Sequence, residues 1–443
     1  IILSDFMDEH QINIRMFRPM ESYQKYGGVL TFARSVGYAV VKKPEGYTTA
    51  KVDQIIQEYE KKSANEQQST AKQDPNIITV VNETFADIKV LGDFKTNEDY
   101  MPYFHSLKKN CVTGYTYASI VGGQTANTEF ELLTGNTLGF LSAGTAAFQL
   151  YIHGQMPSLV SNLKAEGYSG NKAMHPFNPY NYNRPAVYKD FGFTDFIDKF
   201  DFPKNVKRVR EYISDEANVD RIISEYEKNR KKTDQPFYMY NMTIQNHSPY
   251  DKDAANFKQP IKIESSKYDA EANRYLNLIK YSDDSLKQLT SYFEKCKEPT
   301  IILFLGDHQP RLTDEFMNKI TNGQYQTWSS EQMMKRYQVP FVIWANYDIK
   351  EQHIEKTSMN YIQSILTKTA GVKMTGYQRF LNEVRKEVPT ITSQGYWGKN
   401  GKFYQINDKG SPYYGIIQKY RMIQYNMMFD KKNRRDSFFE VSK

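Results

Sequence analysis

Four short apolar runs constrain the fold of this chain more than any other feature of its sequence. They cover residues 76–82, 236–241, 300–305 and 339–345 and are rich in β-branched and aromatic side chains. Each run is apolar at nearly every position, which is typical of a strand that is buried on both faces of a sheet. Such a sheet needs helices on both sides.

The segments between these runs show helical patterns. The patterns cover residues 126–133, 155–166, 219–231 and 268–295, and the last is long enough for two helices. Strands that alternate with helices indicate an α/β fold. We therefore expect a largely parallel central sheet flanked by helices.

The two ends of the chain depart from this alternation. Residues 1–50 have no strong strand or helix period, 52–62 predict an amphipathic helix, and the polar stretch 63–73 predicts a linker. Near the other end, residues 396–404 predict a hairpin with an Asn-Gly turn, and 415–429 predict a helix.

These changes of pattern suggest three parts. We expect an N-terminal linker and helical segment, then a large central domain, then a small α+β subdomain, at residues 1–75, 76–375 and 376–443. The chain begins at Ile1 without a methionine, and no apolar run approaches the roughly 20 residues of a spanning helix. Any anchor of the natural protein is therefore expected upstream.

Composition excludes several classes of protein. The two cysteines, Cys111 and Cys296, belong to no CxxC pair and no Cys/His cluster, which excludes redox and zinc-knuckle functions. No basic-aromatic module indicates a nucleic-acid partner. The net charge of +7 suits work near anionic lipid or polymer, although it suits solubility equally well.

Two of the predicted strands lead into metal-binding side chains. The first run is followed by Glu83, and the third by Gly306, Asp307 and His308. Ligands of open α/β sheets bind beyond the carboxyl ends of the strands, and carboxylate and imidazole groups suit a divalent metal. A helix N-cap at Asp307 and a structural histidine are the alternatives for each feature alone.

A second signal is the stretch Gly122-Gly123-Gln124-Thr125 before an amphipathic helix. Glycines allow close approach of the backbone, and a helix N-terminus attracts a phosphate group. Thr125 taken alone is better explained as an N-cap. Two loops add His175, Arg184 and His247, and arginine binds phosphate oxygens through paired donors.

Five motifs in the same order resemble the lipoteichoic acid synthase family. They are NETF, GGQTANTEFELLTG, MHPFNPYNYNR followed by VYKDFGF, IQNHSPY and LGDHQPR. Members of that family are sulfatase-like phosphoglycerol transferases of the alkaline phosphatase superfamily. The resemblance covers roughly residues 76–370 and implies a sulfatase/alkaline-phosphatase-like fold. It also implies that residues 76–375 are a catalytic domain and that the segment 1–75 follows a membrane region absent from this sequence.

The resemblance also implies a role for each motif residue. One divalent metal, manganese or magnesium, would be held by Glu83, Thr125, Asp307 and His308, and Thr125 would be the nucleophile. The substrate head group would be surrounded by His175, Asn178, Tyr182, Arg184 and His247, with Arg184 and His247 also in catalytic roles.

Two positions depart from the pattern of that family. Tyr182 replaces a usual tryptophan and still offers a ring for stacking. Phe177 stands where well-known members carry an aspartate that contacts glycerol, and the neighbouring Asn178 is the substitute that the sequence offers. The identity of the head group is therefore left open.

The function that the resemblance implies is transfer of glycerol phosphate from phosphatidylglycerol, through a phosphoglyceryl-threonine intermediate, to a cell-envelope glycopolymer or lipoteichoic acid. The expected place is the extracellular face of the membrane of a Gram-positive-type bacterium. The alternatives are a phosphodiesterase or phosphatase with the same site, a phosphoethanolamine transferase, and a non-catalytic polymer-binding domain. The sequence lacks the Cys/Ser-x-Pro-x-Arg signature of sulfatases, so sulfate-ester hydrolysis is not expected.

Overall fold

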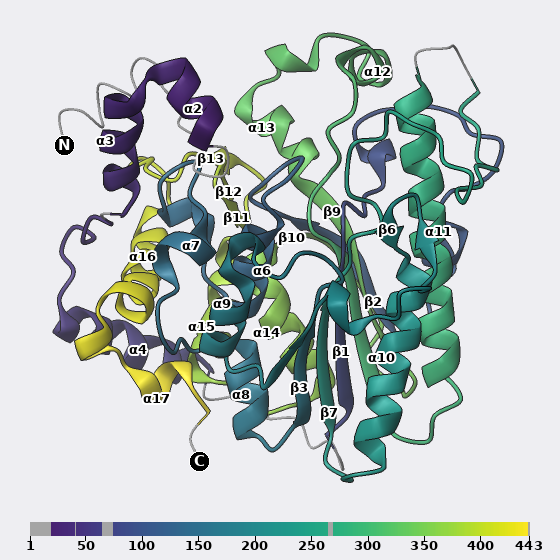
Figure 1. Cartoon of the computed structure of the whole chain (residues 1–443). Helices are drawn as coiled ribbons and strands as arrows, with labels where there is room; N and C mark the ends of the chain where they lie inside the picture. The colour runs from purple at the N-terminus through teal and green to yellow at the C-terminus, as the bar shows by residue number, and fades with distance from the viewer. Residues whose placement is uncertain (1–18, 40, 64–73, 265–268, 442–443) are drawn as a thin grey trace.

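An eight-stranded sheet forms the centre of the computed structural model, which describes residues 19–39, 41–63, 74–264 and 269–441 (Figure 1). The order of the strands is β10-β2-β9-β8-β1-β7-β3-β4. Their bounds are β1 Asn76–Asn82, β2 Cys111–Tyr117, β3 Ser169–Met174, β4 Asp195–Ile197, β7 Phe237–Met242, β8 Thr300–Gly306, β9 Gln338–Ala345 and β10 Gln352–Ser358.

Most neighbours in the sheet are parallel. Val80 of β1 lies opposite Asn241 of β7 and Phe304 of β8, and β3 continues in parallel beyond β7. Strand β9 is antiparallel to both of its neighbours, β8 and β2. Strand β2 therefore runs in the same direction as β8. The prediction of a largely parallel α/β sheet is confirmed.

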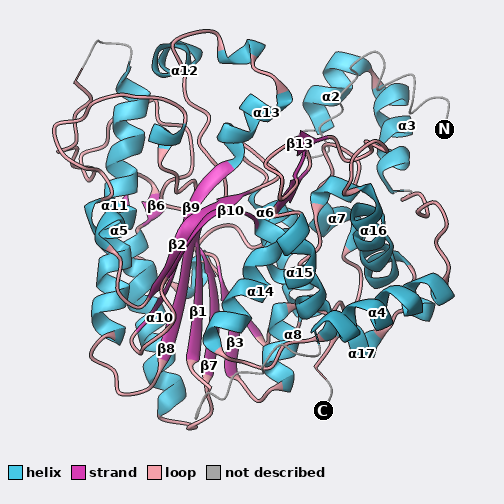
Figure 2. Ribbon diagram, turned by 180° about the vertical axis from the view of Figure 1, so that it is seen from behind, coloured by secondary structure: helices cyan, strands magenta, loops and turns pink. Residues whose placement is uncertain are grey.

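Both faces of the sheet are covered because alternate side chains of a strand point to opposite sides. Ile77 and Val81 of β1 join one apolar cluster, whereas Ile78 and Val80 join a second cluster on the other face. The two views in Figures 1 and 2 show helices on each side of the strands. This double burial explains why the central strands are apolar throughout.

The helices divide between the two clusters. The first cluster includes side chains of α4 Thr49–Ser63, α6 Thr125–Thr134, α7 Ala147–Tyr151, α8 Leu159–Ala165, α9 Arg184–Phe191, α14 Met359–Ala370, α15 Gly376–Glu387, α16 Tyr414–Phe429 and α17 Asp436–Phe439. The second includes side chains of α5 Pro102–Ser106, α10 Asp215–Arg230, α11 Ala270–Phe293 and α12 Asp314–Ile320.

Smaller elements complete the described chain. The strands β5 Arg208–Val209 and β6 Tyr212–Ile213 pair with each other. The remaining short elements are α13 Ser330–Met333 and the 3-10 turns Ile88–Val90, Leu138–Phe140, Asn181–Asn183, Lys199–Asp201, Tyr325–Thr327, Met334–Tyr337 and Lys431–Asn433.

The termini contain more structure than the sequence indicated. Helices α2 Pro19–Tyr26 and α3 Gly28–Ala39 lie where no period was found, whereas α4 confirms the helix predicted near residues 52–62. Most of the predicted linker, at 64–73, lies outside the described residues.

The C-terminal region forms a small second sheet of β11 Thr390–Thr392, β12 Gly395–Trp397 and β13 Phe403–Tyr404. The predicted hairpin corresponds to β12 and β13, which are antiparallel, and the predicted helix to α16. The boundaries at 75 and 375 stay predictions. Among the helices that the structure describes, none is long and apolar enough to cross a bilayer.

Candidate active site

The carboxyl ends of four adjacent parallel strands meet at one edge of the sheet. His175 follows β3, Glu83 follows β1, and Asp307 follows β8, while His247 lies five residues beyond β7. A pocket of about 160 Å³ opens at this edge, and seven residues predicted for the site line it: Glu83, Thr125, His175, Tyr182, Arg184, His247 and His308. Residues far apart in the sequence are therefore brought into one cleft.

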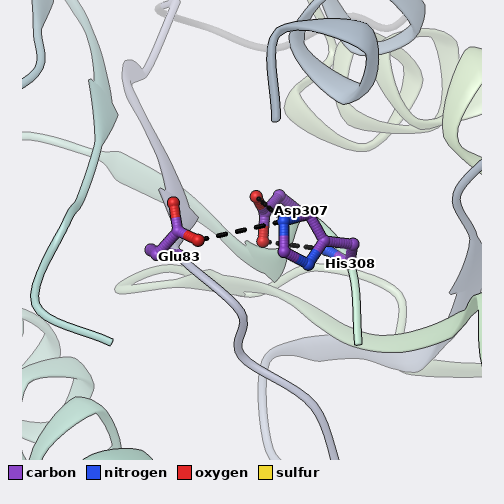
Figure 3. Close-up of side chains that lie close together, drawn as sticks. All are labelled: Glu83, Asp307 and His308. Carbon is purple, nitrogen blue, oxygen red and sulfur yellow. Dashed lines mark hydrogen bonds and ion pairs between the residues drawn. The ribbon is translucent and has the colours of Figure 1, made fainter. Parts of the chain in front are cut away.

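Glu83, Asp307 and His308 form a buried group with the donor set of a metal site (Figure 3). One ligand atom from each residue lies within 4.8 Å of the others. The Nε2 atom of His308 is 3.8 Å from Oε1 of Glu83 and 3.2 Å from Oδ2 of Asp307. Two carboxylates and one imidazole are suitable ligands for a divalent cation.

The hydrogen bonds of this group leave ligand atoms unused. His308 Nδ1 lies 3.0 Å from the carbonyl oxygen of Gln309, which fixes the proton on Nδ1 and leaves the lone pair on Nε2. Asp307 Oδ1 accepts hydrogen bonds from the N–H groups of Thr84 and His308. Within the described residues, neither Asp307 Oδ2 nor His308 Nε2 has a hydrogen-bond partner, although both are buried. Unpaired buried acceptors of this kind fit a bound cation.

Gly306 allows this geometry. A Cβ atom at Gly306 would lie 1.8 Å from the carbonyl oxygen of Phe85, so any other residue would push the loop after β1 away from the end of β8. The close approach brings the N–H of Thr84 to 2.7 Å from Asp307 Oδ1. Glu83 and Asp307 are thereby held side by side.

The charge of the group is concentrated and poorly solvated. Burial, and next the charge of Asp307, raise the pKa of the Glu83 carboxyl to about 8. The hydroxyl of Thr84 donates a hydrogen bond to Glu83 Oε1 at 2.8 Å and offsets part of this effect. A cation would offset much more, because it interacts with both carboxylates at once.

Thr125 is the first residue of α6 and faces the same pocket. Gln124 occupies the N-cap position with a φ of 69° and makes no side-chain capping hydrogen bond within the described chain. The alternative that Thr125 is the N-cap is therefore wrong. A helix that starts without a side-chain cap presents its first N–H groups to an anion.

Two hydrogen bonds fix α6 relative to the group formed by Glu83, Asp307 and His308. Thr128 Oγ1 donates to the carbonyl oxygen of Asp307 at 2.8 Å, and the N–H of Gly122 donates to the carbonyl oxygen of Gln309 at 3.0 Å. Gly122 itself has a φ of 67°, a conformation that glycine adopts without strain. The position of Thr125 beside Glu83 and His308 is thus set by contacts from both sides of the loop.

Arg184 lines the pocket from a buried position. Its Nε and Nη2 atoms donate to Oε1 of Glu129, at 3.1 and 2.7 Å, and both side chains are almost completely buried. Burial acts to lower the pKa of Arg184, but the charge of Glu129 outweighs it and the pKa is raised. Glu129 also accepts hydrogen bonds from Tyr188 and Tyr240. Arginine has five N–H donors, so this arrangement leaves donors for a phosphate.

The two histidines of the pocket have defined tautomers. Nδ1 of His175 lies 3.0 Å from the carbonyl oxygen of Met242, and Nδ1 of His247 lies 2.7 Å from that of Ser248. Burial, and next the charge of Arg184, hold the pKa of His175 well below its usual value. His175 is therefore neutral and its Nε2 atom accepts hydrogen bonds.

Aromatic rings cover the remaining walls. The guanidinium of Arg184 lies 5.1 Å from the ring centre of Tyr182, as expected for a cation–π contact. Phe177 packs almost parallel to His247, with 6.2 Å between ring centres, and also contacts Tyr212. The position at which a carboxylate was expected from the resemblance is thus part of an aromatic wall.

Two predicted residues do not line the pocket: Asp307, which is buried beside Glu83 and His308, and Asn178. The Oδ1 atom of Asn178 accepts a hydrogen bond from the N–H of Tyr180 within a turn. Asn181 lines the pocket instead.

The sequence reasoning also missed Glu129. The signal was available, because Glu129 lies four residues after Thr125 in a helix whose other residues are mostly apolar or small. Residues four apart share a helix face, so a carboxylate at this position lies one turn from Thr125.

The fold and the site together define an α/β domain with a candidate catalytic pocket at the carboxyl ends of its parallel strands. The family model described as "Sulfatase" matches residues 75–372. The chain belongs to the sulfatase family.

Three known proteins illustrate what this chain is similar to. A Rhizobium meliloti protein named for cyclic beta-1,2-glucan modification is 30% identical over 433 residues, 96% of this chain and 65% of that protein. The lipoteichoic acid synthase-like YvgJ of Bacillus subtilis is 27% identical over 237 residues, 53% of this chain and 36% of that protein. The structure of the Streptococcus pyogenes phosphoglycerol transferase GacH in complex with sn-glycerol-1-phosphate has a TM-score of 0.73 at 21% identity, covering 91% of this chain and all of that one.

These similarities confirm the resemblance to the lipoteichoic acid synthase family. At 21% sequence identity, the similarity to GacH shows only that the two chains share a fold. The chain spans 65% of the length of the Rhizobium relative and 36% of the length of YvgJ.

Proposed function

We propose that this chain transfers phosphoglycerol from phosphatidylglycerol to a hydroxyl of a cell-envelope glycan, at the outer face of a membrane. The observation that supports the proposal best is the convergence of Thr125, Arg184, Glu83 and His308 in one pocket, with Asp307 buried beside Glu83 and His308. A nucleophile, a phosphate-binding guanidinium and a metal-type donor set are the parts that transfer of a phosphoryl group requires. Names of relatives that mention lipoteichoic acid and glucan modification support a glycan or polymer acceptor.

The proposed cofactor is manganese, or magnesium, held by Glu83, Asp307, His308 and the hydroxyl of Thr125. Bound there, the ion supplies Lewis acidity, which lowers the pKa of the threonine hydroxyl and offsets negative charge on the phosphate. The unpaired Asp307 Oδ2 and His308 Nε2 atoms support this assignment.

In the first step, the hydroxyl of Thr125 has lost its proton to water, and the deprotonated Oγ1 attacks the phosphorus of the donor. The bond between Thr125 Oγ1 and phosphorus forms while the bond between phosphorus and the diacylglycerol oxygen breaks. The departing oxygen takes a proton from the Nε2 atom of His247, whose ring enters this step protonated on both nitrogens and keeps its Nδ1–H on the carbonyl oxygen of Ser248. The products are diacylglycerol and a phosphoglyceryl group on Thr125.

In the second step, an acceptor hydroxyl attacks the same phosphorus. His247 takes the proton of that hydroxyl, and Thr125 departs with its oxygen. Arg184 and the N-terminus of α6 stabilise the charge on the non-bridging oxygens in both steps. The neutral His175 accepts a hydrogen bond from a hydroxyl of the head group.

Phe177 changes how the glycerol is held. Because an aromatic wall replaces the carboxylate, the carbon atoms of the glycerol pack against Phe177. The hydroxyl groups of the glycerol form hydrogen bonds with His175 and Asn181.

The test is the intact mass of the protein after incubation with manganese and phosphatidylglycerol. We expect a glycerophosphoryl adduct and released diacylglycerol for the wild type and neither for Thr125→Ala. Metal-loaded wild type that forms no adduct and releases no diacylglycerol would remove the phosphoglycerol assignment. An adduct that decays only to free glycerol phosphate, whatever glycan is supplied, would indicate a hydrolase instead.

A further inference from the structure

A groove continues from the Thr125 pocket across the surface to α16. Gln124 lines both the active-site pocket and a neighbouring hollow of about 240 Å³. Ser142 and Ser393 line that middle hollow and also an outer hollow of about 670 Å³. Each hollow therefore shares wall residues with the next, and this row of three hollows is called the groove; its outer part alone has the size of a ligand site.

The middle of the groove is polar but carries no charge. None of the residues that line the middle hollow is acidic or basic, and hydroxyl and amide side chains dominate its polar surface: Ser119, Asn127, Ser142, Thr145, Ser393 and Gln394. Such groups both donate and accept hydrogen bonds. A surface of this kind matches the hydroxyl groups of uncharged sugars and offers no positive charge to an anion.

The outer hollow is basic. Arg421, Lys42 and Lys43 line it, and the one acidic side chain among its lining residues, Glu45, is 3.6 Å from Lys409, which offsets its charge. The outer part of the groove is therefore suited to an anionic group.

Arg421 is held in place without being neutralised. Its guanidinium lies 5.2 Å from the ring centre of Phe140, and its Nη2 atom donates to Oδ1 of Asn407 at 2.8 Å. Within the described residues it makes no ion pair, and its buried Nε atom has no hydrogen-bond partner. A guanidinium supported in this way has several donors left for a phosphate.

Three distant segments build this outer end. Lys42 and Lys43 follow α3, Phe140 ends a 3-10 turn between α6 and α7, and Arg421 lies in α16. Figure 1 shows α3, α16 and β13 grouped on the same side of α6. The arrangement exists only because the N-terminal and C-terminal parts of the chain meet beside the catalytic helix.

We propose that this groove binds the acceptor, an oligosaccharide that already carries phosphodiester substituents. Its uncharged sugars occupy the middle hollow, a free hydroxyl reaches Thr125, and an earlier substituent pairs with Arg421, Lys42 and Lys43. The inference rests on the proposed function and names the substrate class of its second step. It follows that a partly substituted glycan is a better acceptor than an unsubstituted one.

The first test measures binding without any donor lipid. Isothermal titration calorimetry compares cyclic β-1,2-glucan with the same glucan carrying phosphoglycerol groups. We expect the substituted glucan to bind the wild type about tenfold more tightly, because one charge-assisted hydrogen bond contributes an affinity difference of about that size. This preference should decrease at high salt. Arg421→Gln should remove this preference, while the matched surface variant Lys287→Gln on α11 should keep it.

The double variant Lys42→Gln/Lys43→Gln provides the same test at exposed positions, should Arg421→Gln fail to fold. Equal affinity of the wild type for both glucans, or binding of neither, would overturn the inference. So would a preference that survives in Arg421→Gln. Binding to phosphatidylglycerol vesicles that depends on Lys42 and Lys43, with no binding of glucan, would assign the basic end to a lipid surface and overturn it as well.

The second test separates this inference from the proposed function. Arg421→Gln should form the Thr125 adduct at the wild-type rate, because Arg421 lies outside the donor pocket, but should pass about tenfold less of it to the substituted glucan. If the wild type forms no adduct, the proposed function fails, and the binding measurement still decides the groove. Normal adduct formation with unchanged transfer in the variant would overturn the groove alone.

Discussion

Two buried clusters of charge lie side by side in this protein and are satisfied in different ways. In the first, Arg184 donates twice to Glu129, and the second oxygen of Glu129 accepts hydrogen bonds from Tyr188 and Tyr240. In the second, Glu83 and Asp307 lie together with His308, and within the described chain Asp307 Oδ2 and His308 Nε2 have no hydrogen-bond partner.

The difference separates two roles for buried charge. The carboxylate of Glu129 is neutralised and fully hydrogen-bonded, so it holds Arg184 in position and needs nothing from outside the chain. The Glu83–Asp307–His308 group carries excess negative charge and unused acceptors, so its free energy is lowered by a cation. Completeness of hydrogen bonding thus distinguishes a positioning residue from a candidate ligand.

Asp307→Ala tests the unsatisfied cluster and should have the largest effect. We expect metal content to fall from about one equivalent to near zero, and adduct formation at Thr125 to fall about a thousandfold or more, because both the ion and its charge compensation are lost. Elemental analysis and intact-mass kinetics measure the two quantities. The exposed Asp251→Asn is the control, and retention of metal by Asp307→Ala would show that the ligand set is wrong.

Glu129→Ala tests the satisfied cluster. Removing the carboxylate leaves Arg184 buried without its partner, which should lower the free energy of unfolding by about 3–5 kcal/mol. Replacing both residues, as Glu129→Leu with Arg184→Met, should cost less than Glu129→Ala alone, since no isolated charge remains. Urea denaturation of the three proteins checks this. A loss below about 1 kcal/mol in Glu129→Ala would mean that Arg184 does not depend on its partner.

A pH series sharpens the contrast between the clusters. The pKa of Glu83 is raised from 4.5 to about 8, so in metal-free protein its contribution to stability is fully present below pH 4.5 and is lost as the pH rises to about 8. A cation binds the ionised carboxylate, so the rise in Tm on adding manganese should grow across the same range.

The matched variant for this series is Glu83→Gln, which removes the titrating group. Its metal-free stability should decline less between pH 5 and 8 than that of the wild type, and its response to manganese should be small throughout. Parallel curves for the two metal-free proteins would contradict the assignment of the titration to Glu83.

Tyr182→Leu should have the smallest effect. It removes the ring beside Arg184 without touching Glu129, and a cation–π contact contributes about 1 kcal/mol, so adduct formation should fall about fivefold with little change in Tm. Tyr180→Leu, two residues away and exposed, should behave as the wild type. An equal loss in both variants would point to a general effect on the loop.

Sequence patterns predicted the elements whose residues are buried on both faces. The runs at β1, β7, β8 and β9 were found within one residue of their bounds because double burial forces apolar side chains at every position. Strands β3 and β10 were missed because most of their positions are not apolar and many are only partly buried. Strand β2 was also not predicted, and it contains Gly114 in its middle. A Cβ atom at Gly114 would lie 2.0 Å from the carbonyl oxygen of Ile354, so this position needs glycine for the close approach of β10 and cannot carry an apolar side chain. Helix α11 is a single helix of 24 residues, although its sequence is long enough for two.

For the site, the sequence alone determined which residues end the buried strands, and so identified Glu83, Asp307 and His308 as candidate ligands. The sequence also indicated a phosphate-binding turn at the glycine pair before Thr125, and binding residues in the loops that carry His175, Arg184 and His247. These signals are local, because each depends on residues adjacent in the chain.

The partners of these residues follow from the tertiary structure. Glu129 was paired with Arg184, Asn181 rather than Asn178 was placed at the pocket, and Phe177 was packed on His247. The groove from Gln124 to Arg421 was likewise formed by segments that are distant in the sequence, near residues 42, 140, 393 and 421. The physical reason is that hydrogen bonding and charge compensation of buried groups depend on long-range packing, which no periodicity in the sequence records.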